Sequence, residues 1–235
     1  MAPLKLGMVG GGQGAFIGGV HRMAARMDGC FDLVAGAFSS DAARAHASAA
    51  ELGIHGDRSY ADFKEMAKSE AVRSDRIDVV SIVTPNHLHG PIAEVFLAHD
   101  ISVICDKPMT ATLVQAESLL KAAKTSKGHF FLTHNYTGYP MIRQARQMVD
   151  EGVLGEIRIV EANYLQDWLS EAPAEDNKQA KWRMDAAQSG GGAIGDIGTH
   201  AHNLACFVTR LRATALSATL SSNVAGRMVD DDARI

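Results

Sequence analysis

The chain has 235 residues, of which 46% are hydrophobic, enough for one large core or two modest domains. A formal net charge of -4 gives no electrostatic reason to expect a nucleic acid or an anionic membrane as partner. Three cysteines without metal-type spacing favour free thiols, and the sequence shows neither a signal peptide nor an apolar run of membrane-spanning length. We therefore expect a cytoplasmic protein.

Short apolar runs alternate with helical patterns in the first part of the chain. The sequence predicts strands at 4–9, 31–38, 77–83, 102–105 and 129–133, with helices at 18–27, 41–52, 61–68, 91–98 and 113–124. Such alternation implies right-handed crossovers and a parallel, doubly wound sheet. We expect this α/β domain to cover residues 1–138 and to bind its ligand at the carboxyl ends of its strands.

The pattern changes after residue 140. A helix is predicted at 141–151, strands at 156–164 and 213–224, an irregular segment at 166–189, and a helix at 193–208. These elements indicate an α+β domain over 139–235 whose sheet is mostly antiparallel and incomplete, because two strands and one covering helix do not close a sheet domain. The open face of this sheet predicts a homo-oligomer, a dimer or a tetramer.

A glycine-rich turn joins the first strand to the first helix. Gly10 and Gly12 fit the spacing of a dinucleotide-binding turn, whereas the third position falls on Ala15, and Gly18 is expected to permit close packing instead. In this context the backbone approaches a pyrophosphate at a helix N-terminus. The expected contacts are Gly10, Gly12, Gln13, Gly14, Ala15 and Phe16.

The tip of the second strand leaves the choice of dinucleotide open. An acidic side chain there would bind the ribose hydroxyls of NAD. This chain has Ser39 and Ser40 at that tip, and Asp41 is expected to cap the next helix. Arg44 lies one turn further and could pair with the 2′-phosphate of NADP.

Two later loops follow strand ends. The run from Thr84 through Pro85, Asn86 and His87 to His89 comes directly after a strand that is expected to be buried on both faces. His87, His89 and His99 are the histidines that could be imagined as metal ligands, but ordinary loop polarity is the favoured interpretation, and we expect no metal. Lys107, after Asp106 at the next strand end, could stabilise a developing alkoxide.

Asp196 and His200 stand four positions apart in the helix predicted at 193–208. On an α-helix this spacing puts both side chains on one face. An imidazole can take a proton near neutral pH, and a nearby carboxylate can orient it. A helix cap beside a surface histidine is the alternative interpretation. A nucleotide site, a lysine and this pair together indicate redox chemistry at a carbon–oxygen bond.

Five motifs, which follow one another in the order typical of the family, resemble those of the Gfo/Idh/MocA oxidoreductases. They are the glycine turn, the run from Thr84 to His89, Asp106-Lys107-Pro108, Asn135-Tyr136 and the run from Gly195 to His200. The resemblance implies a Rossmann domain followed by an α+β domain, with Lys107, Asp196 and His200 in the catalytic positions. Asp106 stands where glutamate is commoner, and Thr137 replaces an arginine that often follows the asparagine–tyrosine pair.

The resemblance also implies an enzyme that transfers a hydride between a sugar, an inositol or a related polyol and NAD or NADP. The remaining implied cofactor contacts are Thr84, Pro85, Asn86, His89, Asp106, Lys107 and Asn135. The implied substrate contacts are Lys107, Tyr136, Gln166, Trp168, Asp196 and His200, since the run from Tyr164 to Trp168 resembles the sugar-oxidising branch. Two alternatives remain open: a glycosidase that uses bound NAD transiently, and a non-enzymatic dinucleotide sensor.

Overall fold

The computed structural model describes residues 2–174 and 177–235, which form two compact units. The first unit extends to Thr133 and the second begins at His134.

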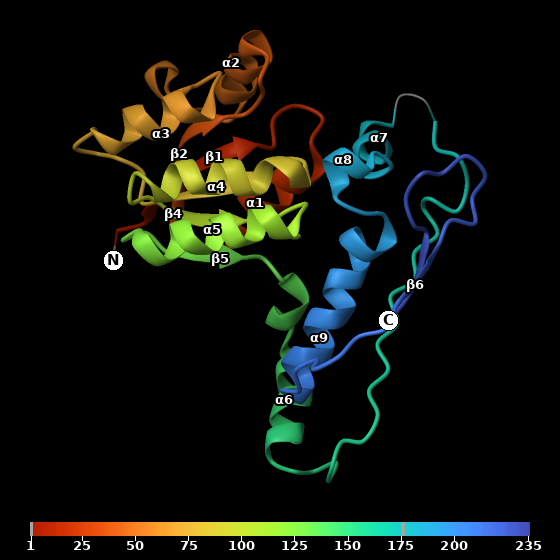
Figure 1. The fold of residues 1–235 in the computed structure, drawn as a ribbon. Helices are drawn as coiled ribbons and strands as arrows, with labels where there is room; N and C mark the ends of the chain where they lie inside the picture. The colour runs from red at the N-terminus through yellow and green to blue at the C-terminus, as the bar shows by residue number, and fades with distance from the viewer. Residues whose placement is uncertain (1, 175–176) are drawn as a thin grey trace. The chain divides into compact units, whose positions relative to one another are not determined.

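The first unit is built on a five-stranded parallel sheet, as the alternating pattern predicts (Figure 1). The order across the sheet is β2-β1-β3-β4-β5, so the chain reverses its direction of growth next to β1. The strands are β1 (Leu4–Gly10), β2 (Phe31–Ala37), β3 (Val79–Val83), β4 (Ser102–Cys105) and β5 (Phe130–Leu132). All five residues of β3 are buried, because this central strand has helices on both faces.

The helices of this unit divide between the two faces of the sheet. Successive strand residues point to opposite faces, and Met8 and Val9 accordingly belong to two different hydrophobic clusters. The cluster around Val9 includes Phe96 of α4 and Leu119 of α5, whereas the cluster around Met8 includes Ile17 of α1 and Ala49 of α2. The helices are α1 (Phe16–Met27), α2 (Ala42–Glu51), α3 (Phe63–Ala71), α4 (His89–Leu97) and α5 (Leu113–Thr125).

A buried ion pair connects α3 to the chain that precedes it and to the start of β3. The Glu70 side chain is fully buried and accepts hydrogen bonds from Arg58 Nε at 3.0 Å and from the Tyr60 hydroxyl at 3.0 Å. It also accepts the backbone N–H of Ile77 at 3.2 Å. Each oxygen of this carboxylate is therefore bonded, which makes its burial tolerable.

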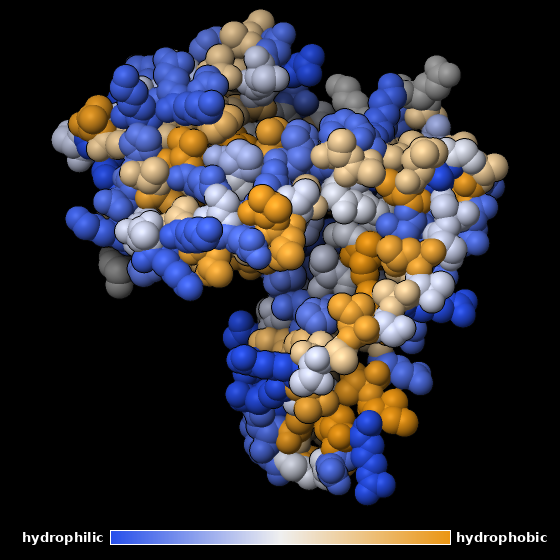
Figure 2. Space-filling view, in the orientation of Figure 1, coloured by the Kyte–Doolittle hydropathy of each residue, from blue (hydrophilic) through white to orange (hydrophobic). Residues whose placement is uncertain are grey.

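The second unit contains helices α6 (Pro140–Asp150) and α9 (Thr199–Thr209), which contact each other, and a two-stranded antiparallel sheet. The strand expected at 156–164 is wrong: the structure assigns no strand to this segment. Its β-branched residues favour a strand, but a strand also needs a hydrogen-bonded neighbour. Ile159 remains 81% exposed, and hydrophobic surface is visible over this unit in Figure 2.

The strand expected at 213–224 shrinks to β6 (Thr219–Ser221), which pairs with β7 (Asp232–Arg234) rather than with the segment at 156–164. A turn stabilised by Asp231 explains this pairing, because its carboxylate accepts the backbone N–H groups of Asn223 and Val224. The segment expected to be irregular also contains two short helices, α7 (Lys178–Arg183) and α8 (Ala186–Ser189). Asn177 and Asp185 cap them, a local signal that the sequence interpretation missed.

No helix in the described ranges combines the length and the apolar character that crossing a membrane would require.

Candidate active site

The glycine turn after β1 has the backbone that its sequence predicts. Gly10, Gly11 and Gly14 all have positive φ angles, which other residues adopt only with strain. A Cβ on Gly18 would lie 2.4 Å from the Gly11 Cα, so Gly18 does allow the helix to pack closely on the turn. Arg22 of α1 stabilises the turn by donating to the Gly11 carbonyl at 2.7 Å, a contact that the sequence analysis missed.

Packing within the protein leaves no room for a side chain at Gly12. A Cβ there would lie 2.8 Å from both the Phe38 carbonyl oxygen and the Ser48 hydroxyl. The next residue, Gln13, donates its backbone N–H to the same hydroxyl at 3.1 Å, and its side chain contacts Glu51 of α2. By contrast, Gly14 is exposed, with nothing within 4 Å of its Cβ position.

The N-terminus of α1 has the features of an anion site. Ala15 occupies the N-cap, offers no capping side chain, and no acidic residue lies in the first turn. The first N–H groups of the helix therefore have no capping side chain, and the helix dipole favours negative charge there. Phe16, the first helical residue, is 70% exposed.

A buried hydroxyl lies beside this turn, at the end of the neighbouring strand. Thr84 follows β3, and its Oγ1 is buried without a hydrogen-bond partner in the described structure. The Thr84 methyl group would lie 2.9 Å from a Cβ on Gly10. An anion site without a capping side chain, a turn rich in glycine and an unsatisfied hydroxyl fit a dinucleotide that lies across the carboxyl ends of β1 and β3.

We expect Ala15→Asp to weaken binding of NADH by at least about tenfold, because a carboxylate would then repel the pyrophosphate at the helix N-terminus. The same substitution should stabilise the protein by about 1 kcal/mol, since aspartate is a good N-cap. Ala15→Asn is the matched control, because it caps the helix without the charge. Fluorescence titration and thermal unfolding of both variants measure the two effects; equal affinity for the two variants would contradict the placement of the pyrophosphate.

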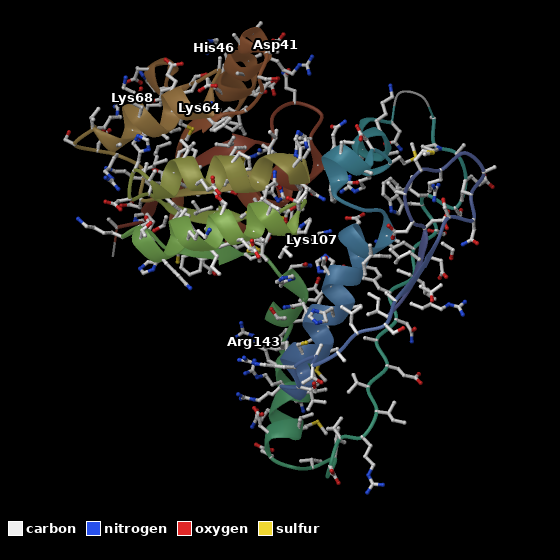
Figure 3. The ribbon with its side chains drawn as sticks, viewed as in Figure 1. Asp41, His46, Lys64, Lys68, Lys107 and Arg143 are labelled. Carbon is white, nitrogen blue, oxygen red and sulfur yellow. The ribbon has the colours of Figure 1, made fainter. Side chains whose placement is uncertain are left out.

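The tip of β2 confirms the expected cap on the second helix. Asp41, which Figure 3 labels, is the N-cap of α2, and its carboxylate accepts the backbone N–H of Arg44 at 2.8 Å. The Ser39 hydroxyl in turn accepts the backbone N–H of Asp41 at 3.1 Å. Ser40 and the Arg44 side chain are exposed. The carboxylate at this tip is thus engaged in capping, whereas the side chain of Arg44 is exposed.

The end of β4 holds Asp106, Lys107 and Pro108, and the peptide bond between Lys107 and Pro108 is cis. The Asp106 carboxylate accepts a hydrogen bond from Thr133 at 2.9 Å and lies 3.6 Å from Nε2 of His21. Burial opposes ionisation of this carboxyl, but the contacts with His21 and Thr133 outweigh it and hold its pKa below the usual value. Asp106 is therefore an ionised anchor directly before Lys107.

His21 is a residue that sequence reasoning missed. Its Nδ1 lies 2.8 Å from the hydroxyl of Ser81, in the middle of β3, while its other nitrogen faces Asp106. One histidine of α1 therefore connects two strands under the Lys107 loop. The only signal in the sequence is that His21 falls one helical turn after Gly18, on the side of α1 that packs on the sheet.

The loop after β3 contributes backbone rather than free side chains. Pro85 is the N-cap of a 3-10 turn, η2 (Asn86–Leu88), and Asn86 is buried. His89 is 1% exposed, and both of its ring nitrogens face backbone carbonyls, those of Pro108 and Thr84. His89 thus holds the two loops rather than presenting a ring edge to a ligand.

In the second unit, His200 lies within a cluster of aromatic rings. It is 5% exposed, and its ring lies edge-on to that of Tyr136 at 4.7 Å between centroids. The rings of His134 and Tyr164 lie 6.1 and 6.0 Å away. Asn135 and Tyr136 belong to a 3-10 turn, η3 (Asn135–Gly138), in which Asn135 is exposed. The cluster restricts the orientation of His200, which a proton acceptor requires.

Hydrogen bonds connect Tyr136 to the segment that resembles the sugar-oxidising branch. Its hydroxyl lies 2.6 Å from that of Tyr164, which accepts from the Gln166 amide at 3.2 Å. The Gln166 carbonyl accepts the indole N–H of Trp168 at 3.1 Å. Because an indole can only donate, the orientation of the Gln166 amide is fixed. The structure therefore brings Tyr136, Gln166 and Trp168 into one network and adds Tyr164 to it.

Asp196 and His200 lie where a π-helical turn meets an α-helix. Asp196 belongs to the π turn η4 (Ile194–Gly198), and His200 to the first turn of α9. Such single-turn π segments are frequent at functional sites. The Asp196 carboxylate lies 3.2 Å from Nε of Arg183 on α7. Arg183 was missed because the sequence interpretation placed no helix at 178–183.

Within the described ranges, no three side chains of histidine, cysteine, aspartate or glutamate come together as metal ligands. Of the histidines weighed for this role, His99 bonds the Val95 carbonyl through Nδ1, and both nitrogens of His89 face carbonyls.

Comparison with known proteins decides the family. Residues 4–147 match the profile of an oxidoreductase family with an NAD-binding Rossmann fold, and residues 142–235 match the GFO/IDH/MocA C-terminal domain. The chain belongs to the GFO/IDH/MocA oxidoreductase family. Both matches follow the order of domains that the five sequence motifs imply, so the fold and family expected from the sequence are confirmed.

Solved structures and curated relatives support the same assignment. A crystal structure of an inositol dehydrogenase homolog from Azotobacter vinelandii, complexed with NAD⁺, is 37% identical with a TM-score of 0.94, covering 98% of this chain and 60% of that one. An oxidoreductase from Sinorhizobium meliloti is 51% identical, with a TM-score of 0.88 and coverage of 99% and 60%. Levoglucosan dehydrogenase from Pseudarthrobacter phenanthrenivorans is 30% identical over 223 residues, 94% of this chain and 55% of that protein. The chain thus spans about half the length of the curated relatives it matches.

Proposed function

We propose that the protein is an NAD(P)-dependent dehydrogenase that oxidises a hydroxyl of a sugar, an inositol or a related polyol. The observation that carries this proposal lies in the first unit. The glycine turn, Thr84 and Lys107 follow β1, β3 and β4, three adjacent parallel strands. A cation is therefore positioned at the same edge of the sheet as the dinucleotide turn, where the oxygen of a substrate alcohol would be activated.

The proposed roles follow the chemistry of alcohol oxidation. Bound NAD⁺ or NADP⁺ supplies the hydride acceptor. Lys107 stabilises negative charge on the reacting oxygen, and His200 takes the hydroxyl proton as general base. Asp196 orients the imidazole and the reacting hydroxyl. One carbon–hydrogen bond and one oxygen–hydrogen bond break, so the products are a carbonyl compound, a reduced nicotinamide and a proton.

Gln166 and Trp168 support a carbohydrate substrate. An aromatic face can stack on a sugar ring, while polar side chains beside it read hydroxyl groups. Trp168 is 42% exposed, and its indole N–H is bonded to Gln166, so the orientation of the ring is fixed. The Arg183 guanidinium lies over one face of the ring at 5.6 Å from its centroid, and we propose that the opposite face stacks on the sugar. Levoglucosan dehydrogenase and the inositol dehydrogenase homolog, both similar to this chain, bear names of the same substrate class.

The assay that tests the proposal presents the full-length protein with a panel of sugars and inositols and with NAD⁺ or NADP⁺ separately. We expect at least one polyol to produce a steady rise of absorbance at the nicotinamide band. A glycosidase that uses NAD transiently would cleave a glycoside without net NADH release, and a dinucleotide sensor would bind the nucleotide without turnover. Either of those results would contradict the proposal.

We propose that Arg44 allows the protein to use NADP as well as NAD. Its guanidinium is exposed one turn into α2, and the nearby Asp41 carboxylate is engaged by the helix N-terminus. We expect Arg44→Ala to weaken NADPH binding by about tenfold, since one charged contact with a phosphate is lost, and to leave NADH binding unchanged. Lys64→Ala on α3 is the control for a general loss of positive charge. Equal effects on both nucleotides would contradict a contact with the 2′-phosphate.

We also propose that the complete protein is a cytoplasmic homo-oligomer, a dimer or a tetramer. Large hydrophobic side chains of the second unit are exposed, Leu165 by 88% and Leu216 by 76%, and a symmetric partner is the commonest way to bury such a surface. The three cysteines are free thiols, which fits a reducing compartment. Light scattering of the full-length protein tests the assembly, and a monomer mass at micromolar concentration would contradict it.

A further inference from the structure

His89 is the first residue of α4 and is buried beneath two loops of the candidate site. Its Nδ1 lies 2.7 Å from the carbonyl oxygen of Pro108, and its Nε2 lies 2.8 Å from the carbonyl oxygen of Thr84. One carbonyl belongs to the loop after β4 and the other to the loop after β3. The ring therefore bridges the loop of Lys107 and the loop that carries the unsatisfied Thr84 hydroxyl.

The two acceptors determine what the ring must donate. A backbone carbonyl oxygen only accepts, so both short contacts require an N–H on the histidine side. A neutral imidazole has one N–H and one lone pair, and the lone pair would face a carbonyl oxygen at hydrogen-bond distance. An imidazolium donates at both nitrogens, so it is the state that satisfies both contacts.

We propose that His89 is a positioning residue that acts as a cationic clamp: a doubly protonated ring whose two N–H groups fix the spacing between the Thr84 and Pro108 carbonyls. This inference rests on the proposed function only in that these loops are expected to bind the nicotinamide end of the cofactor. It differs from the sequence expectation for His89, which was a direct contact with the cofactor.

The charged groups that act on the ring are Asp106 and Lys107, which are of opposite sign. Burial, with a smaller contribution from Lys107, lowers the pKa of His89 below its usual value, although the two carbonyls and the Asp106 carboxylate act in the opposite direction. The hydrogen-bond geometry decides between these influences, because a neutral ring would retain one contact and turn the other into a repulsion. Asp106, which is held ionised by His21 and Thr133, provides the counter-charge for the imidazolium.

The direct test is ¹⁵N NMR of the histidine side chains of the full-length protein, with the His89 signals identified by their absence in His89→Gln. We expect both ring nitrogens of His89 to be protonated at pH 7. An unprotonated nitrogen on His89 at that pH would overturn the proposal. This readout needs neither substrate nor turnover, so it stands even if no polyol proves to be oxidised.

A second measurement tests positioning. We expect His89→Gln, which cannot donate along both directions of the ring, to weaken NADH binding by about tenfold because the two loops lose their fixed spacing. The matched control is His99→Gln, near the other end of α4, where one nitrogen bonds one carbonyl. The Kd of wild-type protein should also rise with pH where NMR shows loss of the second proton, and His89→Gln should lack this rise. Wild-type affinity in His89→Gln would overturn the positioning role.

Discussion

Substituting alanine for His200 is expected to lower kcat by about 10²–10⁴-fold, because the substrate hydroxyl then loses its general base. Dinucleotide binding should persist, since His200 lies in the second unit and the glycine turn in the first. His202→Ala is the matched control: it removes an exposed imidazole two positions along the same helix. Steady-state kinetics with the best polyol measure kcat, and titration with NADH measures dinucleotide binding.

Lys107→Met is expected to lower kcat by a factor similar to that of His200→Ala, because the developing alkoxide then lacks a stabilising cation. Lys68→Met, an exposed lysine of α3 that Figure 3 labels together with Lys107, controls for the loss of a charge. Near-wild-type turnover in His200→Ala or in Lys107→Met would contradict the role assigned to that residue.

Glu70→Ala is expected to destabilise the first unit by about 3 kcal/mol, the lower end of the usual cost of removing one partner from a buried ion pair, because Arg58 keeps its second contact with Asp75. The substitution leaves the Arg58 guanidinium, whose side chain is 8% exposed, with Asp75 alone, and also removes the acceptor for the Tyr60 hydroxyl and the Ile77 amide. Thermal unfolding followed by circular dichroism measures the change.

Glu117→Ala is the control for Glu70, since it removes an exposed glutamate from α5 in the same unit and should change stability by less than about 0.5 kcal/mol. Glu70→Gln keeps the volume and should fall between the two. If Glu70→Ala lost no more stability than Glu117→Ala, the ion pair would not stabilise the connection between α3 and β3.

Local sequence signals were sufficient for the first unit. Each strand is a short apolar run, and each connection is long enough for a helix, so the parallel sheet follows from handedness and burial. The glycine turn could be recognised because positive φ angles and close backbone approach require glycine. Gly18 illustrates this: close packing of the helix on the sheet was expected there, and the structure places Gly18 against Gly11 of the glycine turn.

The second unit was harder to predict because its elements depend on partners distant in the sequence. The pattern at 156–164 is that of a strand, but a strand exists only with a neighbour, and β6 instead pairs with a segment eleven residues further along the chain (Ser221 with Asp232). The contacts of Arg183 with Asp196 and of His21 with Asp106 join separate elements, so no local signal reveals them. The same holds for His89, whose two acceptors belong to loops after different strands.

The most direct test of the proposed dehydrogenase activity follows the hydride from the substrate to the nicotinamide. The best polyol of the panel, carrying deuterium on the carbon of the reacting hydroxyl, is incubated with the full-length protein and NAD⁺, and the nucleotide is analysed by mass spectrometry. If the protein oxidises the alcohol as proposed, each turnover places one deuterium on the nicotinamide ring and leaves a carbonyl compound. Product formation with no deuterium in the nucleotide, or with the label lost to water, would contradict it.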